Sequence, residues 1–167
     1  GNSITKDKTI RSKLEFEPGD YYDKNKINKS TEKIIRLPYI NSIKDDVTFN
    51  KDAADIDIFI EENTKTGNLL LAGSFNADVG VGVNFGIEDA NVFGSGNRLK
   101  SNFSINSEDL KFDINYISYP LFNPNISNSY SLYNQENDYT GSFGYKATRY
   151  GIGYSLNFNY NEFTKIS

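Results

Sequence analysis

Two pairs of neighbouring acids, Asp45-Asp46 and Glu61-Glu62, are the residues whose type and spacing most readily suggest chemistry. Paired carboxylates can bind hard cations such as Ca²⁺ when their oxygens converge on one point. Neighbouring residues in a strand or hairpin instead point to opposite faces or into water. We therefore interpret these pairs as solvated charge and expect no metal site and no cofactor.

The chain contains no histidine and no cysteine. A Ser-His-Asp triad and a Cys-His pair are therefore impossible, and the usual ligands of zinc are missing. Gly80, Gly82 and Gly86, with Gly94-x-Gly96, could mimic a phosphate-binding loop, but no helical pattern follows them as such a loop requires. We expect a protein that is not an enzyme and has no catalytic residues.

Charge and aromatic residues divide the chain into two parts, residues 1–67 and 68–167. The first part holds 25 of the charged residues and 6 aromatics, whereas the second holds 15 charged residues and 18 aromatics. The net charge of −4 offers no basic patch for nucleic acid, so we expect no nucleic-acid partner. No apolar run approaches the roughly 18 residues of a membrane-spanning helix.

Residues 1–67 carry signals for two helices followed by two strands. We expect Thr5 to cap a short helix that carries Ile10 and Leu14, and Asp23 to cap a second helix that ends before Pro38. Two strands are predicted at 40–49 and 54–61, joined by a polar turn at 50–52. The residues expected on one face of the second helix are Ile27, Thr31, Ile34 and Ile35.

Residues 68–167 alternate between apolar and small polar residues. In the clearest run, every second residue is apolar: Val79, Val81, Val83, Phe85 and Ile87. A second such run covers 150–161. Weaker alternation makes six candidate strands, at 69–75, 79–88, 99–105, 110–116, around 130–132 and at 150–161. Turn-forming clusters separate them, so an antiparallel meander is predicted.

This alternation has two interpretations. In a soluble antiparallel sheet with one face on a core, apolar residues face the core and polar residues face water, which gives the same alternation. Two features instead favour strands that cross a membrane around a polar interior. The strands have nine to eleven residues, and the positions between their apolar residues are mostly Gly, Ser and Asn. Aromatics near strand ends favour the membrane as well, because such rings sit at headgroup level. They are Tyr116, Tyr119, Phe122, Tyr139, Tyr160 and Phe163.

Several short motifs occur in a recognisable order. In the first part they are Gly1-Asn2-x-x-Thr5, Ile10-Arg11, Gly19-Asp20-x-Tyr22 and Leu37-Pro38-Tyr39-Ile40; in the second, Asn91-Val92-Phe93-Gly94-Ser95-Gly96 and Tyr119-Pro120-Leu121-Phe122. Together they resemble the junction between the last POTRA module and the barrel in outer-membrane assembly factors of the BamA family. Pro38 and Ile40 depart from the family pattern, which usually has Gly and often Phe at these positions.

The resemblance implies an α+β POTRA module over residues 1–67, with β-α-α-β-β order and its first strand lying before Gly1. Residues 68–167 would be an antiparallel meander forming the first strands of an incomplete transmembrane β-barrel, with further strands after Ser167. The implied function is to fold and insert β-barrel proteins into the bacterial outer membrane, with the first 67 residues in the periplasm. The implied partners are unfolded outer-membrane proteins, accessory lipoproteins and the lipid bilayer.

The resemblance also implies a site. The first barrel strand would open sideways and pair with client strands by β-augmentation. The residues of that edge are Asn68, Leu69, Leu70, Leu71, Ala72, Gly73, Ser74 and Phe75. The residues that carry the family motifs are Gly19, Asp20, Asn91, Phe93, Gly94, Gly96, Pro120 and Phe122.

Three other functions fit parts of the pattern. A two-partner secretion transporter would export a polypeptide and carry about two POTRA modules, whereas an assembly factor carries about five. A porin-like channel would conduct ions and leave client folding unchanged. A soluble β-rich binding module would be monomeric and indifferent to detergent.

Overall fold

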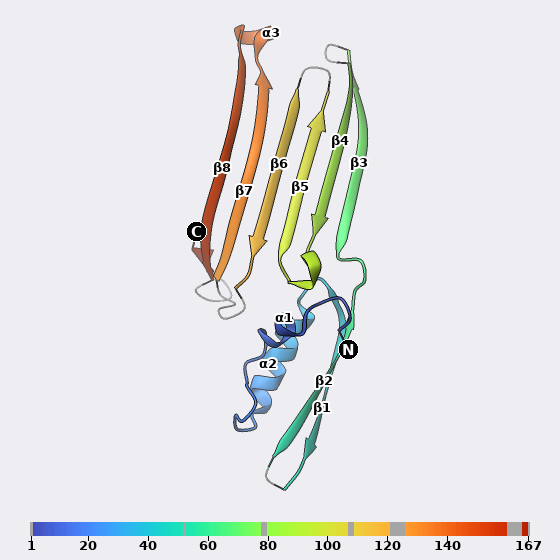
Figure 1. Cartoon of the computed structure of the whole chain (residues 1–167), viewed down its shortest axis with the longest axis vertical. Coiled ribbons are helices and arrows are strands. Elements are labelled where there is room, and N and C mark those ends of the chain that lie inside the picture. The colour runs from blue at the N-terminus through green and yellow to red at the C-terminus, as the bar shows by residue number, and fades with distance from the viewer. Residues whose placement is uncertain are drawn as a thin grey trace. The chain divides into compact units, whose positions relative to one another are not determined.

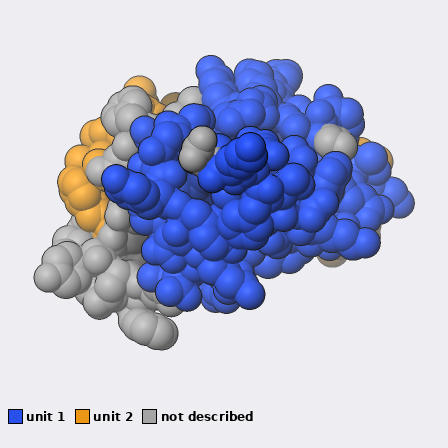
Figure 2. Space-filling model, turned by 90° about the horizontal axis from the view of Figure 1, so that it is seen from below, with its two compact units in different colours: residues 1–66, 93–96 blue, residues 67–92, 97–167 orange. Residues whose placement is uncertain are grey.

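The structure is a computed structural model that describes residues 2–51, 53–77, 80–106, 109–120, 126–159 and 165–166. The chain divides into two compact units (Figures 1 and 2). Unit 1 comprises residues 1–66 together with 93–96, and unit 2 comprises residues 67–92 and 97–167. The short segment 93–96 thus belongs to unit 1, although the chain on both sides of it belongs to unit 2.

Unit 1 contains two helices and a two-stranded antiparallel sheet. The helices are α1 (Asp7–Arg11) and α2 (Lys24–Ile35), and the strands are β1 (Ile40–Phe49) and β2 (Ala54–Glu62). β1 and β2 pair from Phe49 opposite Ala54 to Ile40 opposite Glu62, with one register irregularity near Ser42. The predicted order of helix, helix, strand, strand is confirmed. Among the described residues, no helix is both long and apolar enough to span a membrane.

The two predicted helix caps had different outcomes. Asp23 caps α2 as predicted, because its carboxylate accepts a hydrogen bond from the Asn25 N–H at 2.8 Å. The prediction for Thr5 was wrong: Lys6 occupies the N-cap of α1 and makes no side-chain capping bond. α1 also ends at Arg11, so Leu14 lies beyond it. Thr5 instead contributes to a contact with Glu62, described below.

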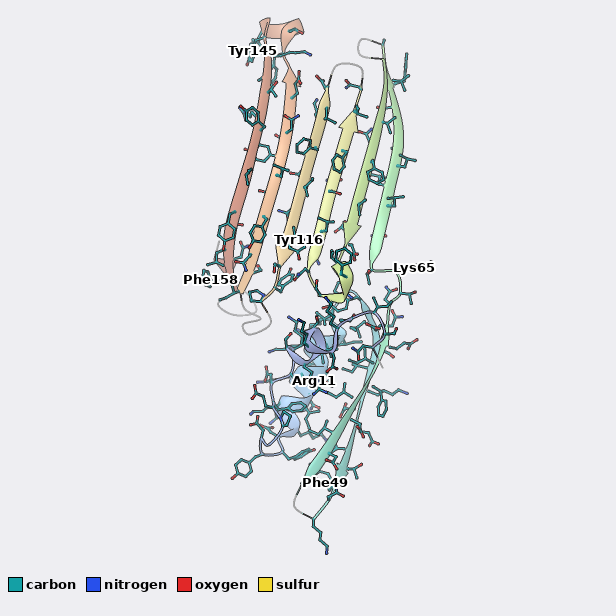
Figure 3. The ribbon with its side chains drawn as sticks, viewed as in Figure 1. Arg11, Phe49, Lys65, Tyr116, Tyr145 and Phe158 are labelled. Carbon is teal, nitrogen blue, oxygen red and sulfur yellow. The ribbon has the colours of Figure 1, made fainter. Side chains whose placement is uncertain are left out.

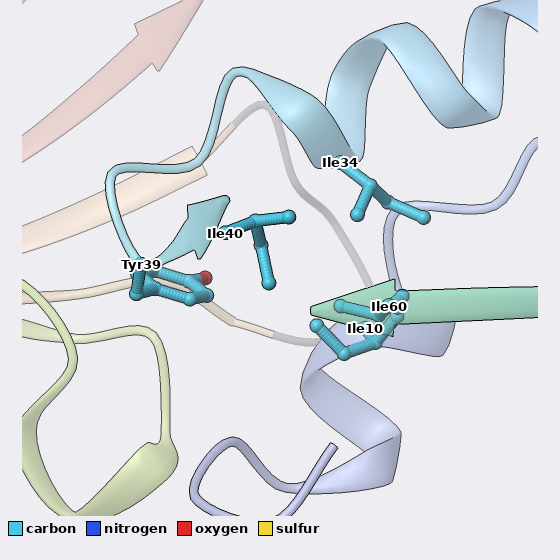
Figure 4. Packing of buried hydrophobic residues seen from close by; sticks show 5 residues of the cluster. All are labelled: Ile10, Ile34, Tyr39, Ile40 and Ile60. Atoms are coloured by element: carbon cyan, nitrogen blue, oxygen red, sulfur yellow. The ribbon is translucent and has the colours of Figure 1, made fainter. Parts of the chain in front are cut away.

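A small apolar core joins the helices to the hairpin of unit 1. Figure 4 shows its five buried members, Ile10, Ile34, Tyr39, Ile40 and Ile60. Ile27 of α2 is also buried, as predicted, and so is Ser30. The prediction that Ile35 shares this buried face was wrong, since it is 40% exposed. One residue past Ile34 turns the side chain by about 100° around the helix, away from the core.

Unit 2 is a single antiparallel meander. Its strands are β3 (Gly67–Asn76), β4 (Gly80–Asp89), β5 (Arg98–Ile105), β6 (Leu110–Ser118), β7 (Ile126–Asp138), β8 (Lys146–Asn159) and β9 (Lys165–Ile166). They hydrogen-bond in chain order from β3 to β9, and Figure 1 shows β3 to β8 side by side in this order. The η1 turn (Val92–Gly94) precedes β5, and the short helix α3 (Thr140–Phe143) joins β7 to β8.

The six predicted strands are confirmed in order and approximate position, and the sequence pattern missed β9, which has only two residues. Some residues used in those predictions lie outside the described part of the chain, namely Val79, Phe122, Tyr160 and Phe163.

The strand register of unit 2 collects most of the apolar residues on one face. Directly paired residues share a face of an antiparallel sheet. Phe85 pairs with Phe103, and Phe103 pairs with Phe112. The same face continues through the pairs Tyr116–Tyr130 and Tyr130–Tyr154. Tyr116 and Phe158, labelled in Figure 3, belong to this face, which we call the apolar face.

The opposite face of unit 2, the polar face, carries small and polar residues. Each of several glycines there lies against a cross-strand side chain, so that an added methyl group would collide with it. The Ser74 hydroxyl lies over Gly82, and the Tyr133 hydroxyl lies over Gly151. The glycines on the polar face therefore make room for polar side chains of the neighbouring strands.

A pair of adjacent isoleucines tests the core of unit 1. Ile34→Ala should lower the free energy of unfolding by about 2–5 kcal/mol, because it leaves a cavity among buried side chains. The matched control Ile35→Ala should cost less than about 1 kcal/mol, since Ile35 is 40% exposed and lies outside the buried cluster. Denaturant titration followed by helical circular dichroism measures both variants, and equal losses would contradict this core assignment.

Candidate functional site

The predicted pairing edge, residues 68–75, lies wholly within β3. β3 is an end strand of the described sheet and pairs only with β4. An end strand has one row of backbone N–H and C=O groups without a strand partner. At about 3.3 Å per residue, the ten residues of β3 give an edge of roughly 33 Å.

Most side chains of β3 are exposed to solvent. Leu69, Leu71 and Phe75 lie on the apolar face, and Phe75 is 78% exposed. Leu70 lies on the polar face and is also exposed. A side chain added at Gly73 would meet nothing within 4 Å. Much of the side-chain surface of β3 is therefore left without packing contacts.

Glu62, the last residue of β2, holds the N-terminal segment through a cluster of hydrogen bonds. Its Oε2 accepts from the N–H groups of Ser3 and Ile4, at 2.5 and 2.8 Å, and its Oε1 accepts from the Thr5 N–H at 2.7 Å. Three successive backbone N–H groups that converge on one anion form a nest. The anion in this nest is the protein's own carboxylate.

The nest changes the acidity of Glu62. Burial alone raises the pKa of this carboxyl, but the Thr5 side chain and the N–H groups of Ile4, Ser3 and Thr5 stabilise the charged form. Their combined effect lowers the pKa of Glu62 from 4.5 to about 2. Glu62 is therefore ionised at neutral pH.

The segment held by Glu62 is also bonded to the turn at 93–96. The Gly94 carbonyl accepts hydrogen bonds from the Lys6 N–H at 2.8 Å and from the buried Thr9 hydroxyl at 3.2 Å. A Cβ added at Gly94 would lie 2.1 Å from the Ile4 carbonyl oxygen. The segment from Ser3 to Thr9 therefore forms hydrogen bonds with both Glu62 and Gly94.

The same turn explains the other residues of its motif. Gly94 and Gly96 have left-handed φ angles of 69° and 72°, and a Cβ at Gly96 would crowd Thr9 and Tyr39. Phe93 is also left-handed, at φ 51°, and is 89% exposed. Asn91 is buried, and its N–H donates to the Asp89 carboxylate at 2.9 Å. The glycines of the motif are thus required because Gly94 lies close to the Ile4 backbone and Gly96 lies close to the Thr9 and Tyr39 side chains.

The remaining motif residues have structural places apart from this turn. Gly19 adopts φ 98°, and the Asp20 carboxylate accepts from the Glu17 N–H and lies 3.4 Å from the Lys26 ammonium. Pro120 follows Tyr119, whose N–H donates to the Asn97 side chain. Phe122 lies outside the described residues.

The acidic pairs do not converge on a cation. Glu61 accepts a hydrogen bond from the Ser42 hydroxyl, whereas Glu62 turns to its nest. Asp45 and Asp46 have different strand partners, Ile58 and Asp57. Within the part of the chain that the structure describes, no three acidic side chains gather as a metal site would need.

Sequence reasoning missed the role of Glu62. Asn2 and Thr5 stood out as motif residues, and the structure gives both a reason: the Asn2 amide donates to the Thr5 carbonyl, and Thr5 binds Glu62. Nothing in the local pattern distinguishes Glu62 from Glu61. The contact joins residues 57 or more positions apart, beyond the reach of any periodicity.

Two left-handed glycines form a matched test of the turn. Gly94→Ala should displace Ile4 and weaken the bond between the Lys6 N–H and Gly94, whereas Gly144→Ala adds a methyl group in open space. Both variants carry a left-handed strain of about 1–2 kcal/mol. Amide exchange at Lys6 should therefore accelerate in Gly94→Ala alone, and equal exchange in both variants would contradict the contact.

The acidity of Glu62 can be titrated directly. Because its pKa is lower in the folded chain, the nest stabilises the fold above pH 4.5, and this stabilisation is lost as the pH falls from 4.5 toward 2. Thr5→Val removes a hydroxyl donor and should raise the pKa of Glu62 toward 4.5. Carboxyl NMR titration measures this pKa in both proteins; a value near 4.5 in the unchanged protein would refute the nest.

Comparisons with known proteins agree with this architecture. Residues 1–63 match the POTRA family, described as a surface antigen variable number repeat. The chain is 27% identical over 190 residues to the outer membrane protein assembly factor BamA of Buchnera aphidicola subsp. Acyrthosiphon pisum, covering 99% of this chain and 30% of that protein. It is 25% identical over 175 residues to BamA of Neisseria meningitidis serogroup B, covering 100% of this chain and 22% of that protein.

The fold is also that of a solved structure. The crystal structure of BamA from Haemophilus ducreyi lacking POTRA domains 1–3 superposes with a TM-score of 0.71 at 24% identity, covering 97% of this chain and 31% of that one. The chain thus spans less than a third of the length of these relatives. Taken with the fold and the motifs, these matches make the chain BamA-like, with a POTRA domain at residues 1–63 followed by an antiparallel sheet of the BamA type.

Proposed function

We propose that this chain works in outer-membrane protein assembly, as the part of an assembly factor in which a POTRA module leads into membrane-spanning strands. The observation that carries the proposal is the sheet of unit 2, which combines an apolar face, many of whose side chains are exposed, with an open end strand. Ile152, on the apolar face, is 86% exposed. Large exposed apolar surfaces mark membrane or protein contacts.

The apolar face is suited to lipid. Apart from β9, the strands of unit 2 have 8 to 14 residues, and a tilted spanning strand needs about 9–11. The polar face, with its glycines, serines and asparagines, would then face a barrel interior. Hydrocarbon offers no partner for unpaired backbone groups, so the sheet must be closed by further strands in the working protein.

The edge of β3 would receive client strands. A client segment that adds there gains backbone hydrogen bonds along the whole edge, and its own apolar residues continue the apolar face into the bilayer. Asn68 to Phe75 supply this edge in the proposal. No small-molecule pocket, metal or cofactor takes part in this mechanism.

The POTRA module would work in the periplasm, over residues 1–67, and contact accessory lipoproteins or client chains. A groove lined by Ile10, Leu14, Phe16 and residues of β2 runs along the module. An opening strand of β-α-α-β-β order would pair along β2 and cover the apolar side chains there.

Photo-cross-linking tests the client edge. A benzoylphenylalanine at Ser74, on β3, should form cross-links to an unfolded outer-membrane protein during its assembly in liposomes. The control position Asn115 lies on β6, between two paired strands, and should form none. The complete gene product containing this chain is used for both.

The same liposomes separate the alternatives. A secretion transporter would move a polypeptide across the bilayer without inserting it, and a porin-like channel would conduct ions without accelerating client folding. Either result, together with the lack of cross-links at Ser74, would overturn the assembly function. Faster insertion of the client with cross-links at Ser74 would support it.

A further inference from the structure

One row of directly paired residues crosses the apolar face of unit 2 from β4 to β8. It consists of Asp89, Leu99, Tyr116, Tyr130 and Tyr154. Such a row runs at right angles to the strands, because the hydrogen bonds of an antiparallel sheet do so. We call it the reference row and count positions along each strand from it. β4, β6 and β8 run in the same direction, so their counts can be compared directly.

The apolar stretches of these three strands are shifted against one another. On the apolar face of β4, every second residue of 81–87 is apolar, from eight to two positions before the reference row. In β6 the corresponding stretch is 110–116, from six positions before the row to the row itself. In β8 it is 150–158, from four positions before the row to four after it. The centre of the stretch therefore moves from five positions before the row, through three, to the row itself.

This shift makes the apolar stretches an inclined band. Five positions along a strand span about 17 Å, and the four strand spacings from β4 to β8 span about 19 Å. The band is therefore inclined by about 40° to the reference row. Strands of transmembrane barrels tilt by about 35–45°. When the strands of this sheet take such a tilt, the band becomes level with a membrane.

Charged side chains mark diagonally opposite corners of the band. At the start of β8, Lys146 lies eight positions before the reference row and pairs with Glu136 at 3.3 Å and with Asp109 at 3.6 Å. Val81 of β4 has the same count of eight, but it is apolar and 69% exposed. At the opposite corner, Asp89 ends β4 on the row itself. Charged groups are costly to place in hydrocarbon, so a boundary parallel to the row fits neither corner.

Polar groups within the band and at its edge have hydrogen-bond partners. Tyr116 is the last ring of the band on β6, and its hydroxyl accepts a hydrogen bond from the Asn97 amide at 2.7 Å. Inside the band, the Tyr154 hydroxyl donates to the Asn128 side chain at 2.9 Å. Among the described residues of β3 to β8, no charged side chain lies on the apolar face between the two charged corners. The band is thus suited to hydrocarbon along its whole inclined course.

We propose that the hydrocarbon boundary of the membrane crosses this sheet obliquely, along the inclined band. The outer part of the β7–β8 hairpin, residues 135–149, then stands outside the hydrocarbon, whereas Val81 of β4 lies within it. This inference rests on the lipid contact in the proposed function and adds to it the depth of each strand. Tyr139, Phe143 and Tyr145, whose ring centroids lie 5.3–6.4 Å apart at the end of this hairpin, are outside the hydrocarbon as well.

Spin labels on two matched pairs of cysteines test the depth. Val81→Cys and Lys146→Cys both lie eight positions before the reference row, and Asp89→Cys and Tyr154→Cys both lie on it. The 167 residues contain no cysteine. Each label is placed in the complete gene product, with any cysteine elsewhere replaced by serine, in phosphatidylcholine vesicles. Electron paramagnetic resonance compares the collisions of each label with oxygen, which concentrates in lipid, and with a nickel chelate, which stays in water.

The two members of each pair should differ in depth. The ratio of oxygen to nickel collisions should be severalfold higher at Val81 than at Lys146, and severalfold higher at Tyr154 than at Asp89. A boundary parallel to the reference row would give equal ratios within each pair, and that result, or the reverse order, would overturn the proposal. If one of these variants does not fold, Val83→Cys and Thr148→Cys, both six positions before the row, repeat the first comparison.

Failure of this inference and failure of the proposed function have different signatures. If all four labels collide mainly with nickel, the lipid contact itself is wrong and both proposals fail. If the labels lie in lipid at equal depth within each pair, only the oblique boundary is wrong. If the depths differ as expected but Ser74 never cross-links to a client, the assembly function fails and the oblique boundary stands.

Discussion

The period of two along a β-strand is the constraint on which most of this molecule depends. In each strand from β3 to β8, the alternate positions that hold most of the apolar residues lie on the same face of the sheet. If one strand shifted by one residue against its neighbour, its apolar residues would turn to the polar face. Large exposed apolar faces mark contacts with a membrane or with other proteins. The proposals that this face meets lipid and that β3 receives a further strand both build on this exposed face.

Glycine has two separate uses in this fold. On the polar face, Gly82 and Gly151 leave room for side chains from the neighbouring strand. In the turn at 93–96, Gly94 and Gly96 allow the backbone to approach Ile4, Thr9 and Tyr39. The first use adjusts the interior of a sheet, and the second brings together segments distant in the chain.

Unit 1 owes its order to polar contacts as much as to its core. Its buried apolar cluster has five members, few for a stable domain on its own. The Glu62 nest and the bonds to Gly94 add charge-assisted and backbone hydrogen bonds at its N-terminal segment. An ionised carboxylate is an effective centre for such a segment because it can accept several N–H groups at once.

Much of this architecture follows from the sequence alone. Alternation in 79–88 and 150–161 determined where strands lie and which residues share a face, and Asp23 marked the start of α2, because these signals depend on neighbours a few positions apart. Only the tertiary structure decided that Thr5 binds Glu62 instead of capping α1, that Ile35 faces outward, and that Gly94 belongs with unit 1. Those outcomes depend on residues far apart in the chain, whose meeting no local pattern encodes.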